Sequence, residues 1–424
     1  MYRQKRSYEN TTVKHSISGN SDNIYRDTKA GQEENMKKAM KATALFLAAG
    51  LLLTACGGKT DTAATTAAAE SAKADAETTA AAAETDAKKP SFVFVCTGQL
   101  GDKSFNDSAN AGMEKIASDL GCEIKVIEIG RDQTKWEPTF QDLAEEGKYD
   151  VIISNGSSSA EVIEQVAEEF PDQKFVMFDS DMEEGKWPNL YAISYKQNEG
   201  SYLAGVLAAL VTESKDMPNA NEDKKIGFVG GSEHPIITDF LVGYIAGAKS
   251  VDPDIKVYVS YIGSWDDTAK GKETAIAQYN QGVDIIFPAA EQAGLGCVEA
   301  AAEMGKYIIG VDSDQAMLFS GSDEAKANVI LSSVLKNVGD SLVRMAEMEE
   351  EGTVPYGKCE FLGLKENGAG LADNEYFQKN VPDEIKKTIE EKKQEVLDGK
   401  IEIPTALGDA DQNEVQALID SVAP

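Results

Sequence analysis

The run Phe92-Val93-Phe94-Val95-Cys96, followed by Gly98-Gln99-Leu100-Gly101-Asp102-Lys103-Ser104-Phe105-Asn106, is the stretch of sequence that decides the fold. Five consecutive apolar residues predict a short strand that is buried on both faces. The glycine-containing turn after them leads into a predicted helix over about residues 105–120. An apolar strand followed by a helix is the repeating unit of a parallel sheet that helices cover on both faces.

This unit recurs along the chain in two cycles. The first cycle predicts strands at 92–96, 124–127, 151–153, 175–178 and 190–194, with helices at 105–120, 136–146, 160–169 and 199–211. The second cycle predicts strands at 225–231, 257–261, 284–287 and 307–311, with helices at 235–250, 268–281 and 294–304. The two cycles predict an α/β protein with two similar lobes, each built on a doubly wound parallel sheet.

The remaining segments are expected to complete both lobes. They comprise residues 328–332, an amphipathic helix over 333–351 and a charged helix over about 383–398. We therefore expect lobe 1 to contain residues 90–221 and 333–354, and lobe 2 to contain residues 222–332 and 355–424. The chain would then cross between the lobes more than once, which indicates a hinged, two-lobed molecule.

A lipoprotein processing site is predicted near the N-terminus. Residues 36–41 are basic, residues 42–53 are apolar, and Leu53-Thr54-Ala55-Cys56 places small residues before a cysteine. This order is typical of a bacterial lipoprotein signal peptide over 36–55, with Cys56 carrying the lipid. Residues 57–89 hold no aromatic or branched aliphatic residue, so we expect residues 56–89 to be a lipidated, disordered tether. We interpret residues 1–35 as a mis-assigned extension, with translation starting at Met36.

Composition excludes several classes of function. The chain has 72 acidic and 41 basic residues and a formal net charge of -31, whereas nucleic-acid binding requires a basic surface. His15 and His234 are the two histidines, which excludes a His-rich metal site and weighs against hydrolases that use a catalytic histidine. Cys96, Cys122, Cys297 and Cys359 lack metal-binding spacing, and we expect Cys96 and Cys122 to be buried thiols. We therefore expect a protein that is not an enzyme and holds neither cofactor nor metal.

Candidate binding residues follow the predicted strands, because parallel α/β sheets bind ligands beyond the carboxyl ends of their strands. Carboxylates, amides and aromatic rings recur there, in residues 98–108, 179–181, 263–267 and 312–314. Aromatic faces stack on rings and carboxylates accept hydrogen bonds, so the set suits a polar, uncharged ligand that contains a ring. For Asp107, Asp267 and Asp314 we prefer a role as helix caps. No phosphate-binding loop is present.

Several segments in order resemble one family. They are residues 101–106 with Ser108-Ala109 and Gly112, residues 202–205, 227–231, 240–247, 263–267 with 270–273, and 310–315. Together they resemble the basic membrane protein family, the PnrA-like substrate-binding lipoproteins of ABC transporters, over roughly residues 90–365.

The resemblance implies a type I periplasmic-binding-protein fold with a purine nucleoside as the typical ligand between the lobes. It implies that Phe105 and Trp265 sandwich the base, although the family commonly has Phe at the second position. It also implies that Asp102, Asn106 and Asp179 bind the ligand near its base, and that Asp312 holds ribose hydroxyls with help from Lys336. The implied partners are a nucleoside and ABC permease subunits. We expect a monomer at the outer face of the cell membrane, held there through its lipid alone.

Two segments depart from the family pattern. Residues 288–294, which include Glu291, replace a glycine-rich turn, and residues 155–159 replace a more apolar turn. Two alternatives to nucleoside delivery therefore stay open. One is a receptor of the same fold for a sugar or another small signalling ligand. The other is a nucleoside hydrolase that uses clustered aspartates, which release of free base would reveal.

Overall fold

Strand β1 (Ser91–Cys96) forms where the apolar run predicts it, and all of its residues are buried. The computed structural model describes residues 88–221 and 223–424. The predicted extension (1–35), the signal peptide (36–55), the lipidated Cys56 and the tether up to residue 87 lie outside the described residues.

The first sheet contains six strands that all pair in parallel. Its order is β11-β5-β4-β3-β1-β2. The strands besides β1 are β2 (Glu123–Glu128), β3 (Val151–Asn155), β4 (Lys174–Phe178), β5 (Leu190–Tyr195) and β11 (Cys359–Leu362). Helices α2 (Phe105–Asp119) and α11 (Val338–Glu351) cover one face, and α3 (Trp136–Glu146) and α4 (Ala160–Glu169) cover the other. Two short 3-10 turns, η2 (Gln133–Lys135) and η3 (Ser157–Ser159), precede α3 and α4.

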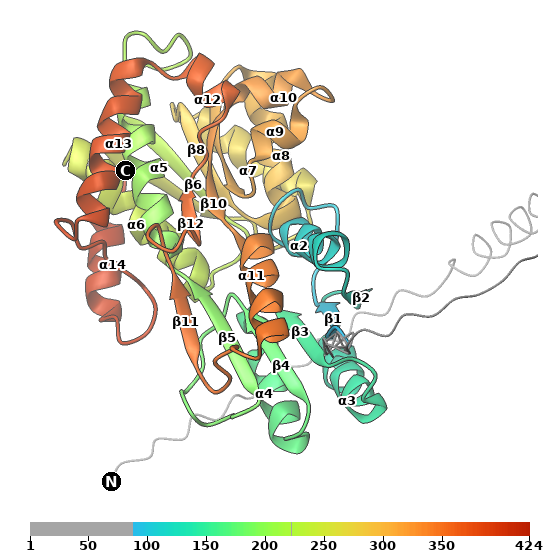
Figure 1. The fold of residues 1–424 in the computed structure, drawn as a ribbon. Coiled ribbons are helices and arrows are strands. Elements are labelled where there is room, and N and C mark those ends of the chain that lie inside the picture. The colour runs from blue at the N-terminus through green and yellow to red at the C-terminus, as the bar shows by residue number, and fades with distance from the viewer. Residues whose placement is uncertain (1–87, 222) are drawn as a thin grey trace, which may run out of the picture. The chain divides into compact units, whose positions relative to one another are not determined.

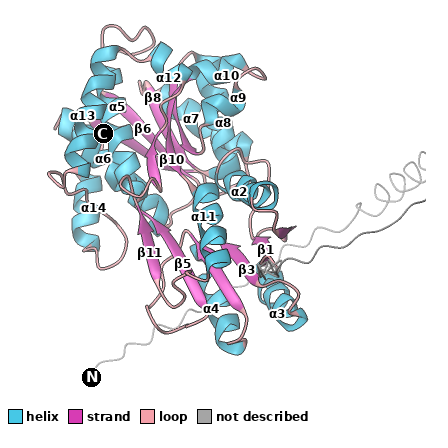
Figure 2. Cartoon of the chain, viewed as in Figure 1, coloured by secondary structure: helices cyan, strands magenta, loops and turns pink. Residues whose placement is uncertain are grey.

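The second sheet repeats this strand order. It runs β12-β10-β9-β8-β6-β7, and β12 is antiparallel to β10. Its strands are β6 (Lys225–Gly230), β7 (Lys256–Tyr261), β8 (Ile285–Ala289), β9 (Tyr307–Asp312), β10 (Ile330–Lys336) and β12 (Ala369–Leu371). The magenta strands of Figure 2 show the two sheets. The predicted pair of doubly wound α/β lobes is thus confirmed.

Helices cover both faces of the second sheet. One face packs against α5 (Gln197–Glu213) and α6 (Pro235–Val251), with α13 (Asp383–Leu397) and α14 (Gln412–Asp420) outside them. The other face packs against α7 (Thr268–Tyr279) and α8 (Glu291–Met304). The short helices α9 (Gln315–Phe319), α10 (Glu324–Val329) and α12 (Glu375–Asn380) complete this lobe.

The sheet pairings move three of the expected lobe boundaries. Helix α5, expected in lobe 1, packs against α6 and β10 of the second lobe. Strand β11, expected in lobe 2, pairs with β5 of the first sheet. Residues 333–336, expected to begin a helix in lobe 1, are the end of β10 and lie between β9 and β12. In Figure 1, α11 and β11, both orange, lie beside the blue and green elements of lobe 1.

Within the described residues the chain passes between the lobes three times. The passages are from β5 to α5, from β10 to α11 and from β11 to β12. Backbone hydrogen bonds join these passages: Lys196 N donates to Leu362 O over 2.9 Å, and Asn337 N donates to Gly368 O over 2.9 Å. The expected hinge of several segments is therefore present as three adjacent connections.

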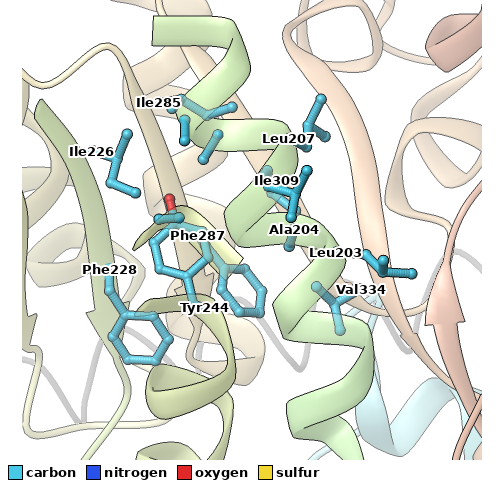
Figure 3. Close-up of a cluster of buried hydrophobic side chains, with 14 of the residues drawn as sticks. Leu203, Ala204, Leu207, Ile226, Phe228, Tyr244, Ile285, Phe287, Ile309 and Val334 are labelled. Carbon is cyan, nitrogen blue, oxygen red and sulfur yellow. The ribbon is translucent and has the colours of Figure 1, made fainter. Parts of the chain in front are cut away.

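The core of each lobe follows from strand alternation, because successive residues of a strand point to opposite faces of the sheet. In the second sheet Phe228, Ile285 and Phe287 pack on the α5–α6 side, whereas Val229 and Ile286 pack on the α7–α8 side. Figure 3 shows the first group together with Leu203 and Leu207 of α5. The strand ends are thus held by apolar layers on both faces.

Two further findings concern membranes and thiols. Among the helices of residues 88–221 and 223–424, none is both long enough and apolar enough to cross a bilayer. Cys96, Cys122, Cys297 and Cys359 are free, and the first three are buried. The expectation of buried thiols at Cys96 and Cys122 is therefore confirmed.

Candidate functional site

The carboxyl ends of strands from both sheets line one cavity between the lobes. The lining leaves about 680 Å³ unfilled by protein atoms, part of it open to solvent. Lobe 1 contributes residues at or after the ends of β1, β2, β3 and β4, and lobe 2 contributes residues at or after the ends of β6, β7, β8, β9 and β10. A cavity at this edge of parallel sheets is where small molecules bind in α/β proteins.

The aromatic side chains of Phe105 and Trp265 reach the cavity from opposite lobes. Phe105, the first residue of α2, packs against Phe178 with ring centroids 5.4 Å apart. Trp265 follows β7, and its ring lies against Gly231, where a Cβ would come within 2.4 Å of the Trp265 Cε3 atom. A side chain at position 231 would displace this ring, so the glycine-rich end of β6 positions an aromatic wall of the cavity.

A buried ion pair forms the polar part of the cavity wall. Lys336, at the end of β10, donates from Nζ to Asp179 Oδ1 over 2.6 Å, and Lys336 is 1% exposed. The Nζ atom also lies 4.8 Å from the ring centroid of Phe240 and 5.6 Å from that of Phe105. Burial of a charge is unfavourable unless it is paired, so the ammonium depends on this carboxylate and on these rings.

Asp312 adds a second buried carboxylate at the end of β9. Its Oδ2 accepts a hydrogen bond from Ser104 Oγ of lobe 1 over 2.5 Å. Burial raises the pKa of Asp312 to about 6; Lys336 and Ser104 oppose this rise, and Asp179 adds to it. A carboxylate held in this way can accept hydrogen bonds from hydroxyl groups of a ligand.

Three acidic residues of the lining have left-handed backbone. The φ angles are +61° for Asp179, +62° for Asp312 and +45° for Glu291. Aspartate tolerates this region better than most residues, but glutamate has no such preference. Strained backbone of this kind is concentrated at functional sites, where it directs a side chain that regular structure would turn away.

Asp102 and Asn106 lie behind the cavity wall and do not line it. Asp102 accepts hydrogen bonds from the backbone N–H groups of Ser104, Asn106 and Asp107, which fixes the start of α2. Burial raises the pKa of Asp102, and these backbone hydrogen bonds oppose the rise. Asn106 Nδ2 donates to Asp102 Oδ2 over 2.9 Å and to Glu291 Oε2 over 3.1 Å. The structure therefore brings five of the seven predicted ligand-binding residues to the cavity: Phe105, Asp179, Trp265, Asp312 and Lys336.

The lining residues that were not predicted from the sequence include Arg131, Trp136 and His234. Arg131 and Trp136 follow β2, and His234 follows β6. A search for binding residues after every predicted strand would therefore have included them. His234 Nδ1 accepts a hydrogen bond from Ile236 N over 3.3 Å and caps α6. Burial lowers the pKa of His234, although Asp179 opposes this, so burial favours the neutral ring.

The three aspartates assigned to capping behave differently. Asp267 caps α7 by accepting from Lys270 N, and Asp314 caps α9 by accepting from Met317 N. Asp107 lies inside α2 and accepts from the backbone N–H groups of Gly101 and Lys103. It therefore fixes the turn before α2, and the prediction that it caps a helix is wrong.

Two doubly wound lobes with a polar cavity between their strand ends define a type I periplasmic-binding protein. Solved structures agree with this class. The chain is 25% identical to a solute-binding protein of an ABC transporter system from Aeropyrum pernix K1, with a TM-score of 0.69 over 79% of this chain and 99% of that one. A transcriptional activator of the comK gene from Bacillus halodurans shares the fold, with 23% identity and a TM-score of 0.59 over 73% of this chain and 99% of that one.

The chain belongs to the PnrA-like family of ABC transporter substrate-binding proteins, whose family model matches residues 89–406. It is 35% identical over 316 residues to basic membrane protein D of Borreliella burgdorferi (strain JD1), covering 73% of this chain and 86% of that protein. It is 32% identical over 347 residues to the ABC transporter nucleoside-binding protein BmpA of Lactococcus lactis subsp. cremoris, covering 78% of this chain and 93% of that protein.

Proposed function

We propose that this protein captures a nucleoside, preferably a purine nucleoside, between its lobes and delivers it to an ABC permease. The observation that carries the proposal is that Phe105 and Trp265 face one cavity from opposite lobes, next to the buried carboxylates Asp179 and Asp312. Aromatic walls accept the faces of a base, and carboxylates accept hydrogen bonds from ribose hydroxyls. The name of the Lactococcus lactis relative, a nucleoside-binding protein, points the same way.

In this proposal different residues bind the base and the ribose of the ligand. Phe105 and Trp265 stack on the base. Asp312 holds the ribose hydroxyls, and the Lys336–Asp179 pair supports it. Asp102 and Asn106 act from behind the cavity wall, because their polar atoms already contact the protein. The protein binds its ligand without chemical change, as expected for a transport receptor.

The proposed setting is the outer face of the cell membrane. Lipid on Cys56 would anchor a monomer there, and residues 56–89 would tether it within reach of the permease. A Cys56→Ser variant should lose membrane association while its ligand binding stays the same. A Cys56→Ser protein that remains in the membrane fraction would contradict the anchor.

A thermal-shift panel tests the proposed function. The purified chain is melted with purine nucleosides, pyrimidine nucleosides and free sugars, and each mixture is then analysed for free base by chromatography. We expect the purine nucleosides to raise the melting temperature the most, since a ligand that binds only the folded state stabilises it, and we expect no free base. Stabilisation by a sugar alone would favour the sugar receptor, and release of free base would favour a hydrolase.

A further inference from the structure

A second polar cluster of the cavity spans the two lobes at Glu291. Glu291 begins α8 in lobe 2, and its Oε2 accepts hydrogen bonds from Arg131 Nη2 and from Asn106 Nδ2, both in lobe 1. The Arg131 guanidinium lies 5.6 Å from the ring centroid of Trp265. The Glu291 cluster therefore borders the aromatic wall on which the proposed base stacks.

The amide of Asn106 has no hydrogen to spare for a ligand. Its two Nδ2 hydrogens go to Asp102 and Glu291, and its Oδ1 accepts from Asn155 Nδ2 over 3.2 Å. Asn155 Oδ1 in turn accepts from Thr97 N over 2.8 Å. Asn106 is thus fixed by protein contacts. Of the two carboxylates to which it donates, Glu291 lines the cavity and Asp102 does not.

Glu291 offers an acceptor to the cavity, and Arg131 offers donors. Both hydrogen bonds that Glu291 makes to described residues fall on Oε2, which leaves Oε1 for a ligand. A carboxylate only accepts hydrogen bonds and a guanidinium only donates them. A ligand edge that meets this pair therefore needs an N–H group next to an acceptor.

We propose that Glu291 and Arg131 read the edge of the bound base and select bases with a lactam edge, such as hypoxanthine and guanine, over bases with an amino edge, such as adenine. The inference rests on the proposed function. A lactam edge places a ring N–H beside a carbonyl oxygen, whereas adenine places a ring nitrogen acceptor beside an amino group. At the same two ring positions, adenine would face a carboxylate with an acceptor and a guanidinium with a donor.

The charges of Glu291 and Arg131 favour the hydrogen bonds of a lactam edge over those of an adenine amino edge. Hydrogen bonds to ionised groups are about twice as strong as neutral ones, and they favour the more acidic donor and the more polar acceptor. The lactam N–H is more acidic than an adenine amino group, and the lactam oxygen is a better acceptor than a ring nitrogen. The closely paired Arg131 and Glu291 therefore gain more from a lactam edge.

Calorimetric titration of the purified chain with inosine and adenosine at pH 8 tests the inference. We expect inosine to bind at least about tenfold more tightly, since the ionised pair gains more from the lactam edge than from the amino edge of adenine. In Glu291→Gln the ratio should fall to about threefold or less, because a carboxamide can both donate and accept. Glu299→Gln is the control: this residue lies on the same helix, pairs with Lys272 and does not line the cavity, so the ratio should stay unchanged.

A modified ligand makes the test independent of any variant. In 1-methylinosine a methyl group replaces the N1 hydrogen, so we expect it to bind the native chain at least about tenfold more weakly than inosine. Equal binding of inosine and 1-methylinosine, equal binding of inosine and adenosine, or a preference that Glu291→Gln retains would each overturn the inference and leave the proposed function intact. Failure of every nucleoside to bind would overturn both.

Discussion

At the scale of single residues, Lys336 and Glu291 each form an ion pair in the cavity wall. Lys336 is buried and pairs with Asp179, whereas Glu291 pairs with Arg131 across the two lobes. Lys336 ends a strand of lobe 2 and Glu291 begins a helix of lobe 2. Each is held by an oppositely charged residue of lobe 1. Each pair therefore forms only when the lobes meet, so recognition of the ligand and closure of the lobes depend on the same atoms.

The protonation of Glu291 should make inosine binding depend on pH. Burial raises the pKa of Glu291 to about 7; Asp102 and Asp312 add to the rise, and Arg131 and Asn106 oppose it. The carboxylate acceptor is present above this pKa and is lost below it. Inosine affinity should therefore fall as the pH decreases from 8 to 6, by up to about tenfold per unit below the pKa if only the ionised form binds.

Calorimetry between pH 6 and 8.5 measures this dependence. Glu291→Gln should remove the decrease that begins near pH 7, and a decrease that remains near pH 6 should come from Asp312, whose pKa is about 6. Inosine affinity that is constant, or that rises as the pH falls, would contradict a carboxylate at position 291 as the acceptor.

At the scale of elements, close helix packing in the second lobe depends on glycines. A Cβ on Gly247 of α6 would lie 1.9 Å from the Tyr202 carbonyl oxygen, and a Cβ on Gly205 of α5 would lie 2.0 Å from the Tyr244 carbonyl oxygen. The backbones of α5 and α6 touch at these points and cannot admit a methyl group without separating. This pair of helices supports the strands that end at the cavity.

Gly247→Ala should lower the free energy of unfolding by about 1–3 kcal/mol or more, because the added methyl group pushes backbone against backbone. Gly294→Ala in α8 is the matched control. There a Cβ would lie 3.7 Å from its nearest neighbour, so the free energy of unfolding should stay equal or rise by up to about 1 kcal/mol. Urea unfolding of the two variants compares them, and equal stability of Gly247→Ala and the native chain would refute the packing argument.

The sequence predicted most elements of this fold, because apolar runs such as residues 92–96 leave little choice except a buried strand. The sequence-based prediction failed where one sequence pattern is compatible with two structures. Residues 333–336 fit an amphipathic helix as well as a strand, and only pairing with β9 and with the distant β12 decides. Helix α5 is apolar on nearly all sides, so its sequence does not say which lobe it joins. Arg131 and His234 were missed for another reason, because the search for binding residues did not include the turns after β2 and β6.

At the scale of the whole molecule, the lobes meet through direct hydrogen bonds as well as through the three connections. Gln315 Nε2 donates to Lys103 O over 3.0 Å, and Ser313 Oγ donates to Ser104 O over 3.1 Å. With the contact between Ser104 and Asp312, these bonds join the start of α2 to the end of β9. The lobes are therefore closed around the cavity, and a ligand that bridges them would stabilise this closed arrangement.

Small-angle X-ray scattering should detect this closure in solution. The hinge allows the lobes to separate without ligand, so a saturating purine nucleoside should lower the radius of gyration and raise the closed fraction. A free sugar at the same concentration is the control and should leave the scattering curve unchanged. Superimposable curves with and without a bound nucleoside would show that binding does not close the lobes.

The most direct test of nucleoside capture between the lobes is calorimetric titration of the native chain and a Phe105→Ala variant with inosine. We predict one site per chain in the native protein. Phe105→Ala should bind inosine at least about tenfold more weakly than the native chain, since base stacking on an aromatic ring contributes about 1–3 kcal/mol. Phe361→Ala, which removes an exposed ring outside the cavity, should bind as the native chain does. Absence of heat with every purine nucleoside, or equal affinity in Phe105→Ala, would contradict the account.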